Sequence, residues 1–418
     1  MHVFLTGLAV VASSAIWTVS ANALPIDFEL YTDLRLSHAS GEPGWFQDWF
    51  GKTRYGGDRD GNSQTTLRLS EVSLIAKADI SWDLQAFAHI KYDPEQNKPV
   101  DIIEAYFTYA PAPKSEFSYA LKAGMFFPHI SRENTSIAWT SPYTITPSAA
   151  NSWVGEEIRA LGLEAKVTYK KDLHRLDVTA AAFGFNDAAG TLLAFRGWVL
   201  GGTKVGAFSR LPLPPLPQIG PNGNFLAQPH WVHPIREIDG RPGYYTALDY
   251  TYNKKIKIGA FYYDNRGDPE QITALQYGWD TRFWNLYGEV EIGGGVKLIS
   301  QYMTGRTLMG FVSPTEGRRH VDVDFDASFI LATKTFGRYR MTARYDWFGT
   351  DDNSFRVIDN NDENGSAFTL AFTAKLAKTS TLMFEYLRVD SDRPARSYLG
   401  FADSQSNDVV QLSFRQRF

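Results

Sequence analysis

From residue 26 onward, the chain repeatedly alternates apolar and polar residues with a period of two. In the first such segment, residues 26–36, Phe28 and Leu34 fall on one face, and Glu29 and Asp33 fall on the other. Alternation of this kind over about ten residues predicts a β-strand. We count sixteen such segments, and weak ones leave fourteen or eighteen strands as alternatives. The segments are residues 26–36, 66–80, 84–92, 100–109, 118–126, 159–169, 175–185, 244–252, 256–263, 277–291, 296–305, 321–335, 338–348, 366–376, 381–389 and 408–418.

The connections between these segments alternate in length. Those after even-numbered segments have only a few residues, whereas those after odd-numbered segments are mostly longer, polar and irregular. Bacterial outer-membrane barrels have an even number of strands, with short periplasmic turns and longer extracellular loops. A soluble β-sandwich has no reason to alternate in this way. The sequence therefore predicts an all-β fold, a transmembrane antiparallel β-barrel of about 16 strands. A secreted soluble all-β binding protein is the alternative.

The polar face of each predicted strand is expected to line the lumen, because in a wide membrane barrel the apolar face meets lipid and the charges line water. In residues 321–334, for example, Val323 and Phe325 alternate with Asp324 and Asp326. A soluble barrel would place the apolar face inside, and alternation alone does not distinguish the two. The predicted lumen wall contains Lys77, Lys122, Lys166, Asp324, Asp326 and Lys375.

Aromatic residues gather near the ends of the predicted strands. The chain has 21 Tyr, 28 Phe and 11 Trp, which together make up 14% of its residues. Girdles of aromatic residues mark the two interfaces of an outer-membrane barrel. We therefore predict a location in the cell outer membrane, in contact with its lipid and lipopolysaccharide. The aromatics near strand ends are Tyr109, Tyr169, Tyr250, Tyr252, Tyr262, Tyr339, Trp347 and Phe418.

Composition and motifs disfavour several classes of function. The chain of 418 residues has a net charge of −4, so no basic excess indicates nucleic acid as a partner. It has no cysteine, which excludes disulfides and thiolate-bound metals. The common motifs of serine hydrolases, zinc proteases and phosphate-binding loops are missing. The acidic stretch 351–363 lacks the spacing of a calcium-binding loop. We predict that the protein is not an enzyme and has neither a cofactor nor a metal.

Residues 1–23 differ from the rest of the chain. Residues 3–19 are apolar, and Ala21 and Ala23 fit a small-x-small cleavage site. The usual Lys or Arg before the apolar run is missing, and an N-terminal anchor is the alternative. The run is short for a membrane helix, however, which needs about 20 residues. We predict a removed signal peptide over residues 1–23, followed by a single barrel domain over residues 24–418.

Residues 128–157, the third loop, interrupt the strand pattern and show no helical or strand period of their own. A loop of this length inside a compact domain is usually functional. We predict that it folds into the barrel and narrows it. Opposed charges at such a constriction select ions and polar solutes, and salt bridges that only hold the loop are the alternative. The charged residues predicted at the constriction are Arg132, Glu133, Glu156, Glu157, Arg159, Arg340 and Arg344. A second long connection, residues 186–241, is predicted to be an extracellular loop.

The last segment places Val410, Leu412 and Phe414 on one face and ends at Phe418. In this the chain resembles Gram-negative outer-membrane porins, whose final strand alternates and ends in Phe, a pattern associated with recognition by the barrel-assembly machinery. The resemblance also covers the signal, the strand layout and the third loop. It implies a water-filled channel, a homotrimer, for passive diffusion of small hydrophilic solutes or ions. An outer-membrane enzyme or adhesin without an open pore is the alternative.

A finer resemblance concerns the run from Gly124 to Pro128, followed by Glu133 and Asn134, which is similar to the phosphate-selective porin family. That similarity implies ladders of Lys and Arg in the pore. The predicted inward positions of this chain mix cations with carboxylates. The preference for anions or cations is therefore left open.

Overall fold

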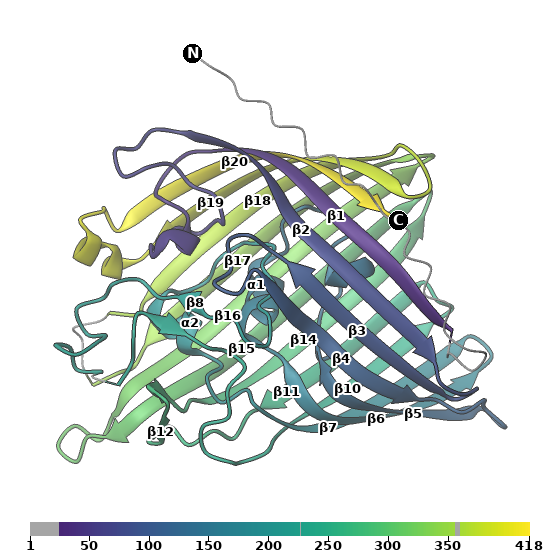
Figure 1. The fold of residues 1–418 in the computed structure, drawn as a ribbon, viewed down its shortest axis with the longest axis horizontal. Coiled ribbons are helices and arrows are strands. Elements are labelled where there is room, and N and C mark those ends of the chain that lie inside the picture. Colours follow the sequence, from purple (N-terminus) through teal and green to yellow (C-terminus); the bar gives the residue numbers. More distant parts are fainter. Residues whose placement is uncertain (1–24, 226, 356–359) are drawn as a thin grey trace, which may run out of the picture.

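Backbone hydrogen bonds join the alternating segments edge to edge into one closed antiparallel barrel (Figure 1). The computed structural model describes residues 25–225, 227–355 and 360–418, so the predicted signal peptide lies outside the described residues. Sixteen strands form the wall, and β20 pairs with β1 to close it. The predicted fold class is confirmed, and the alternatives of fourteen and eighteen strands are wrong.

The wall strands are β1 (Ile26–Ala39), β2 (Gln64–Asp79), β3 (Leu84–Tyr92), β4 (Val100–Tyr109), β5 (Phe117–Phe126), β6 (Ala160–Lys171), β7 (His174–Gly184), β10 (Gly243–Tyr252), β11 (Ile256–Asp264), β14 (Asp280–Gly293), β15 (Val296–Val312), β16 (Arg319–Phe336), β17 (Tyr339–Asp352), β18 (Glu363–Lys375), β19 (Ser380–Asp392) and β20 (Ser404–Arg417). The connections hold two α-helices, three 3₁₀ turns and two short hairpins in the described residues. These are α1 (Ala149–Glu157), α2 (Thr191–Phe195), η1 (Trp45–Gln47), η2 (Ile137–Trp139), η3 (Pro394–Leu399), β8 (Leu211–Pro212) with β9 (Trp231–Val232), and β12 (Ile272–Thr273) with β13 (Gln276–Tyr277). Among the described residues, no helix is long and apolar enough to cross a membrane.

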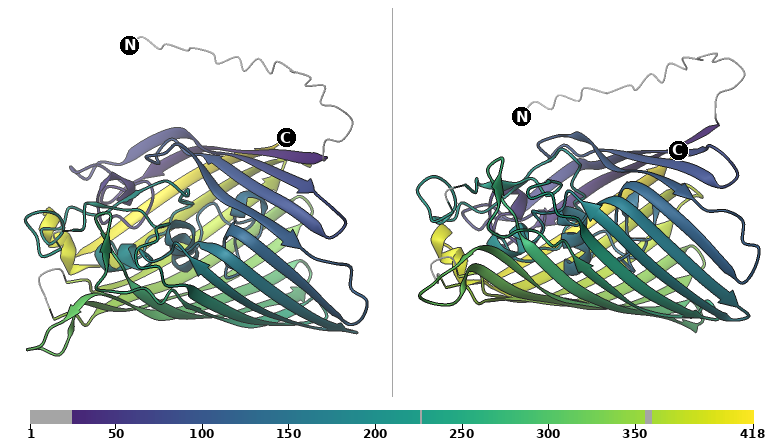
Figure 2. Two further views of the ribbon diagram at one scale, coloured as in Figure 1. Left: turned by 60° about the horizontal axis from the view of Figure 1, so that its bottom comes forward. Right: turned by 90° about the horizontal axis from the view of Figure 1, so that it is seen from below.

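The two ends of the barrel carry different connections. One end has short turns such as 337–338 and 376–379, and the other has long connections such as 185–242. We name these the short-turn end and the long-loop end. The C-terminus lies at the short-turn end, where the backbone N–H of Phe418 donates to the carbonyl of Leu30 at 2.9 Å. Figure 2 shows that the helices and long connections gather toward the long-loop end, and that several of them lie inside the wall.

The outer face of the wall is apolar along the middle of the strands. Leu163, Leu248 and Ile258 each expose half or more of their surface there. At the long-loop end, the outward-facing rings of Tyr262 and Trp284 lie 4.8 Å apart between centroids. An exposed apolar surface of this extent marks contact with a membrane or a partner.

Strand β16 is oriented opposite to the prediction. Its apolar residues Val323 and Phe325 are 0% and 2% exposed and face the lumen. Asp324 and Asp326 share the outward face with Ile330, which is 53% exposed, so neither aspartate lines the lumen as predicted. The physical reason is that the third loop fills the lumen opposite β16 and offers an apolar surface there.

Candidate functional site in the barrel lumen

The third loop folds into the barrel, as predicted, and ends in helix α1, which the sequence pattern did not indicate. Ser148 caps the helix by accepting from the backbone N–H of Asn151. Ala149 and Ala150, which have high helix propensity, follow it directly. All nine residues of α1 are buried. A helix without a polar face gives no amphipathic period, which explains why the pattern did not reveal it.

Glu133 and Arg344, both predicted at the constriction, form an ion pair between the loop and the wall. Nη1 of Arg344, on β17, lies 3.1 Å from Oε2 of Glu133, and its Nε lies 2.8 Å from Asp346. Glu133 also accepts hydrogen bonds from Ser148 and from the side chain of Asn151 at the N-terminus of α1. A carboxylate at this position is favoured by the helix dipole. All three charged side chains of this network are fully buried.

The loop is also fixed to other parts of the wall. Arg132 pairs with Asp249 of β10 at 3.2 Å, and its guanidinium lies 3.8 Å from the ring centroid of Tyr287. On the opposite side, Glu385 of β19 accepts from the backbone N–H groups of Ile145 and Thr146. The third loop therefore crosses the lumen and is tethered at both sides.

Residues 186–241, predicted to be an extracellular loop, lie at the long-loop end, and part of this segment packs inside the wall. All five residues of α2 are buried. The carboxylate of Glu157 accepts from the backbone N–H groups of Gly190 and Leu192 at the start of α2. Glu156 pairs with Arg196 at 2.6 Å. Through these contacts Glu156 and Glu157 join the third loop to residues 186–241, the two segments inserted into the lumen. Because both side chains are 0% exposed, they face no open passage.

Glycine is required where the second segment approaches the wall. Gly197 has a φ of +83°, and a Cβ there would lie 1.6 Å from a carboxylate oxygen of Glu363. This allows Glu363, at the start of β18, to pair with both Lys52 at 2.8 Å and Arg393 at 3.0 Å. Glu363 thus compensates two buried cations, as expected where water does not stabilise an unpaired ion.

An aromatic cluster fills the space between the two segments and the wall. The ring of Trp153 on α1 lies 5.9 Å from Trp198 and 5.3 Å from both Phe283 and Phe325, with edge-to-face geometry. The indole N–H of Trp198 donates to the carbonyl of Gly349 at 2.8 Å. The lumen toward the long-loop end thus contains a packed hydrophobic core.

Arg159 does not face an open passage either. It is 1% exposed, donates to the carbonyl of Val205 at 2.8 Å, and lies 3.4 Å from the ring centroid of Phe127. Like Glu156 and Glu157, it connects the end of the third loop to the second inserted segment.

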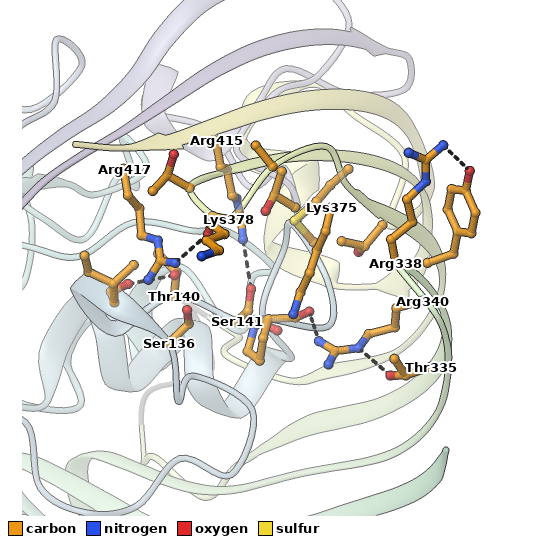
Figure 3. Close-up of a pocket in the computed structure, with 18 of the residues that line it drawn as sticks. Ser136, Thr140, Ser141, Thr335, Arg338, Arg340, Lys375, Lys378, Arg415 and Arg417 are labelled. Carbon is orange, nitrogen blue, oxygen red and sulfur yellow. Dashed lines mark hydrogen bonds between the residues drawn. The ribbon is translucent and has the colours of Figure 1, made fainter. Parts of the chain in front are cut away.

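The short-turn end of the lumen holds a cavity of about 680 Å³, which we name the basic cavity (Figure 3). Its charged lining is Arg338, Arg340, Lys375, Lys378, Arg415 and Arg417, and among the described residues that line it, no side chain is acidic. The third loop contributes Ser136, Thr140 and Ser141. Arg340 donates to the carbonyl of Pro142 at 2.6 Å, and Arg415 donates to that of Ser141 at 2.8 Å. The loop tip therefore forms one side of the cavity.

The remaining predicted wall lysines also face the lumen. Lys122 pairs with Glu164 at 3.2 Å, and Lys166 lies 3.7 Å from Asp177. Lys77 lines a smaller cavity beside the third loop. Lys375 lines the basic cavity.

No family model and no curated protein matches this sequence. Among solved structures, the outer membrane channel DcaP of Acinetobacter baumannii aligns with a TM-score of 0.56 at 14% identity, over 94% of this chain and 97% of that one. An anion-selective porin from Comamonas acidovorans aligns with a TM-score of 0.53 at 12% identity, over 95% and 100%. OmpF of Salmonella typhi, in a complex with daunomycin, aligns with a TM-score of 0.53 at 12% identity, over 94% and 98%. The fold is that of a porin.

Identity this low establishes the porin fold alone, so function must be argued from the lumen. The similarity to phosphate-selective porins stays a prediction, as does the part played by the charged residues in selecting solutes.

Several residues of this porin-fold lumen escaped the sequence analysis. The wall carboxylates Asp249 and Asp346 hold the third loop, and Arg338 and Lys378 lie in or beside short turns, where the period of two ends. A count of cations near the short turns would have been a usable signal for the last two.

One acidic group lies outside the wall strands. Carboxylate oxygens of Asp187, Glu237 and Asp239 lie within 4.8 Å of one another, close enough to share a metal ion. Asp187 already accepts from the backbone N–H groups of Ile238 and Asp239. Burial raises the pKa of Asp187 to about 7, the N–H of Ile238 opposes the shift, and the neighbouring carboxylates add to it. The hydrogen bonds of Asp187 therefore link the start of residues 186–241 to the end of the same segment. Their strength depends on whether Asp187 is protonated.

Proposed function

We propose that this protein is a porin of the Gram-negative outer membrane that lets small hydrophilic solutes or ions diffuse through its lumen. The observation that carries the proposal is the distribution of polarity across the wall. Large apolar side chains are exposed outside, whereas charged side chains such as Arg344 and Glu385 lie inside. A soluble barrel would reverse this arrangement, and lipid requires it.

The third loop supports a selective channel more than a wide one. It crosses the lumen and leaves a charged, water-accessible cavity beside its tip. Pores choose among solutes by width and by charged rings or rows at the lining. The structural neighbours named as porins and channels support this function over an enzyme or adhesin.

Single-channel recording of the detergent-purified protein in a planar bilayer tests the proposal. We expect stable conductance steps, and a homotrimer predicts that they occur in multiples of three. The reversal potential in a salt gradient gives the preference for anions or cations. A protein that inserts but conducts at no voltage contradicts the proposal and returns the enzyme or adhesin as the better hypothesis.

A further inference from the structure

The basic cavity differs from the rest of the lumen because most of its cations have no anionic partner. Arg415 lies 3.6 Å from Asp33, and Arg417 lies 3.6 Å from Glu29. No described carboxylate lies within ion-pair distance, 4.0 Å, of the remaining four cations. These are Arg338, Arg340, Lys375 and Lys378.

The second cavity at the same end has a smaller excess of cations in its lining. That cavity, about 740 Å³, is also lined by many cations, but four carboxylates line it as well. Lys297 pairs there with Glu289 at 2.5 Å, and Arg175 pairs with Asp177 at 2.8 Å. Four of its seven cations lie within 4.0 Å of a carboxylate, compared with two of the six cations of the basic cavity.

The side chains of the basic cavity converge from three directions. Arg340 is held in place because it donates to the carbonyl of Pro142 at 2.6 Å and to Thr335 at 3.2 Å. Figure 3 shows Lys375 extending from the wall toward the same loop tip, between Arg340 and Arg415. Lys378 and Arg417 approach from the neighbouring turn and the terminal strand, where Arg417 donates to the carbonyl of Lys378 at 3.0 Å.

Neutral donors complete the lining. Thr379 and Thr381 line the cavity together with Arg and Lys, whereas the hydroxyl of Thr140 already donates to the carbonyl of Ile137. A guanidinium binds carboxylate or phosphate oxygens through two hydrogen bonds, an ammonium supplies point charge, and hydroxyl groups donate further hydrogen bonds. This combination suits an oxyanion better than a halide, which offers no planar pair of oxygens.

We propose that the basic cavity is a binding site for a small oxyanion, a solute with carboxylate or phosphate groups, at the short-turn end of the pore. The site rests on the proposed function for the route by which the solute reaches it. The lumen thus has a site that attracts anions, although the net charge of the chain is −4. Lys375 and Lys378 supply charge that no carboxylate of the described residues compensates, and they set the affinity.

The test is block of single-channel current by citrate and by inorganic phosphate, each added separately to either side of the bilayer. We expect at least one of them to reduce the current in a concentration-dependent way, more strongly from the short-turn side. A double variant, Lys375→Gln with Lys378→Gln, is expected to raise the half-blocking concentration by about tenfold or more, because two unit charges are removed from the site.

The matched control is Lys334→Gln. Lys334 lies on the outward face of β16, near the same end, opposite the exposed Met341. The change removes one unit charge outside the lumen and should leave the block unaltered. Lys375→Arg with Lys378→Arg keeps the charge and should keep the block, which separates loss of charge from loss of fold.

Calorimetric titration of the detergent-purified protein with citrate and phosphate separates the two proposals. Binding that the double Gln variant loses, in a protein that does not conduct, supports the oxyanion site and contradicts the porin function. Conductance that neither anion blocks, with no heat of binding, overturns the site and leaves the porin function standing. Equal block of the wild type and the double Gln variant also overturns it.

Discussion

Charged side chains are paired toward one end of the lumen and largely unpaired in the basic cavity at the other. Toward the long-loop end, Arg196 pairs with Glu156, and Arg393 pairs with Glu363, all of them buried. At the short-turn end, Lys375 and Lys378 have no carboxylate partner among the described residues, and both are exposed to water. A buried ion needs a partner because the protein must replace its hydration, whereas a hydrated ion does not. The paired charges therefore hold the inserted segments, and the unpaired ones remain available to a solute.

The largest effect expected at the long-loop end is that of Trp153→Ala. The indole lies fully buried among three aromatic rings, so its removal leaves a cavity in the lumen core. We expect a loss of about 3–5 kcal/mol in the free energy of unfolding. Urea denaturation in detergent micelles, followed by the remaining tryptophan fluorescence, measures it.

Trp82→Ala is the matched control for that experiment. Trp82 lies in a short turn and is fully exposed, so its loss should change stability by no more than about 0.5 kcal/mol. Equal effects of the two changes would contradict the packed core that α1 forms with the wall.

Glu133→Gln is expected to reduce stability by less than Trp153→Ala does. The amide oxygen keeps an acceptor for the N-terminus of α1, and Arg344 keeps its pair with Asp346. The loss of one charged partner should cost about 1.5–3 kcal/mol in the free energy of unfolding. Glu270→Gln removes an exposed carboxylate 3.8 Å from Arg319 and should cost less than about 1 kcal/mol. If Glu133→Gln were as mild as this control, the loop would not depend on the buried pair.

Protonation of Asp187, at the long-loop end, should change the single-channel open times by a few-fold at most. Its pKa of about 7 in the folded chain lies above the ordinary 3.8, so the folded state holds the proton more tightly. The resulting stabilisation is complete below pH 3.8 and is lost as the pH rises through 7. We expect the segment 186–241 to be docked more firmly at pH 5 than at pH 8, and single-channel open times to be longer at pH 8.

The variant Asp187→Asn supplies the control. The amide oxygen can still accept from Ile238 but does not titrate between pH 5 and pH 8. Its open times should vary less with pH than those of the wild type. An unchanged pH profile would assign the effect to another group.

Sequence alone predicted the wall and the inward third loop, because strand period and connection length are local signals. It also placed Glu133 and Arg344 at the constriction, and the structure shows that these two residues pair. It did not predict where Glu156 and Glu157 point. Their partners belong to residues 186–241, about 30 to 40 positions further along the chain, and no local pattern brings that segment into the lumen.

Strands β16 and β17 show the same limit within the wall. In β17, Met341 and Trp347 face outward and Arg344 faces inward, as predicted. In β16 the apolar face turns inward because Phe325 packs against Trp153, a residue far away in sequence. Both strands alternate equally well, so the period gives the two faces but not which of them meets the lumen.

The smallest expected effect, that of Asp324→Asn, tests this reversal directly. Asp324 lies on the outward face, its side chain 51% exposed and 3.6 Å from Arg306. An exposed pair of this kind contributes at most about 1 kcal/mol, and a charge outside the wall is separated from ions in the lumen. The reversal potential in a salt gradient should therefore equal that of the wild type within error. Lys375→Gln, which removes a charge from the basic cavity, should shift it toward cation preference under the same conditions. If Asp324→Asn instead shifts the reversal potential by as much as Lys375→Gln, Asp324 lines the water-filled path. The orientation of β16, and the packing of α1 that explains it, would then both be wrong.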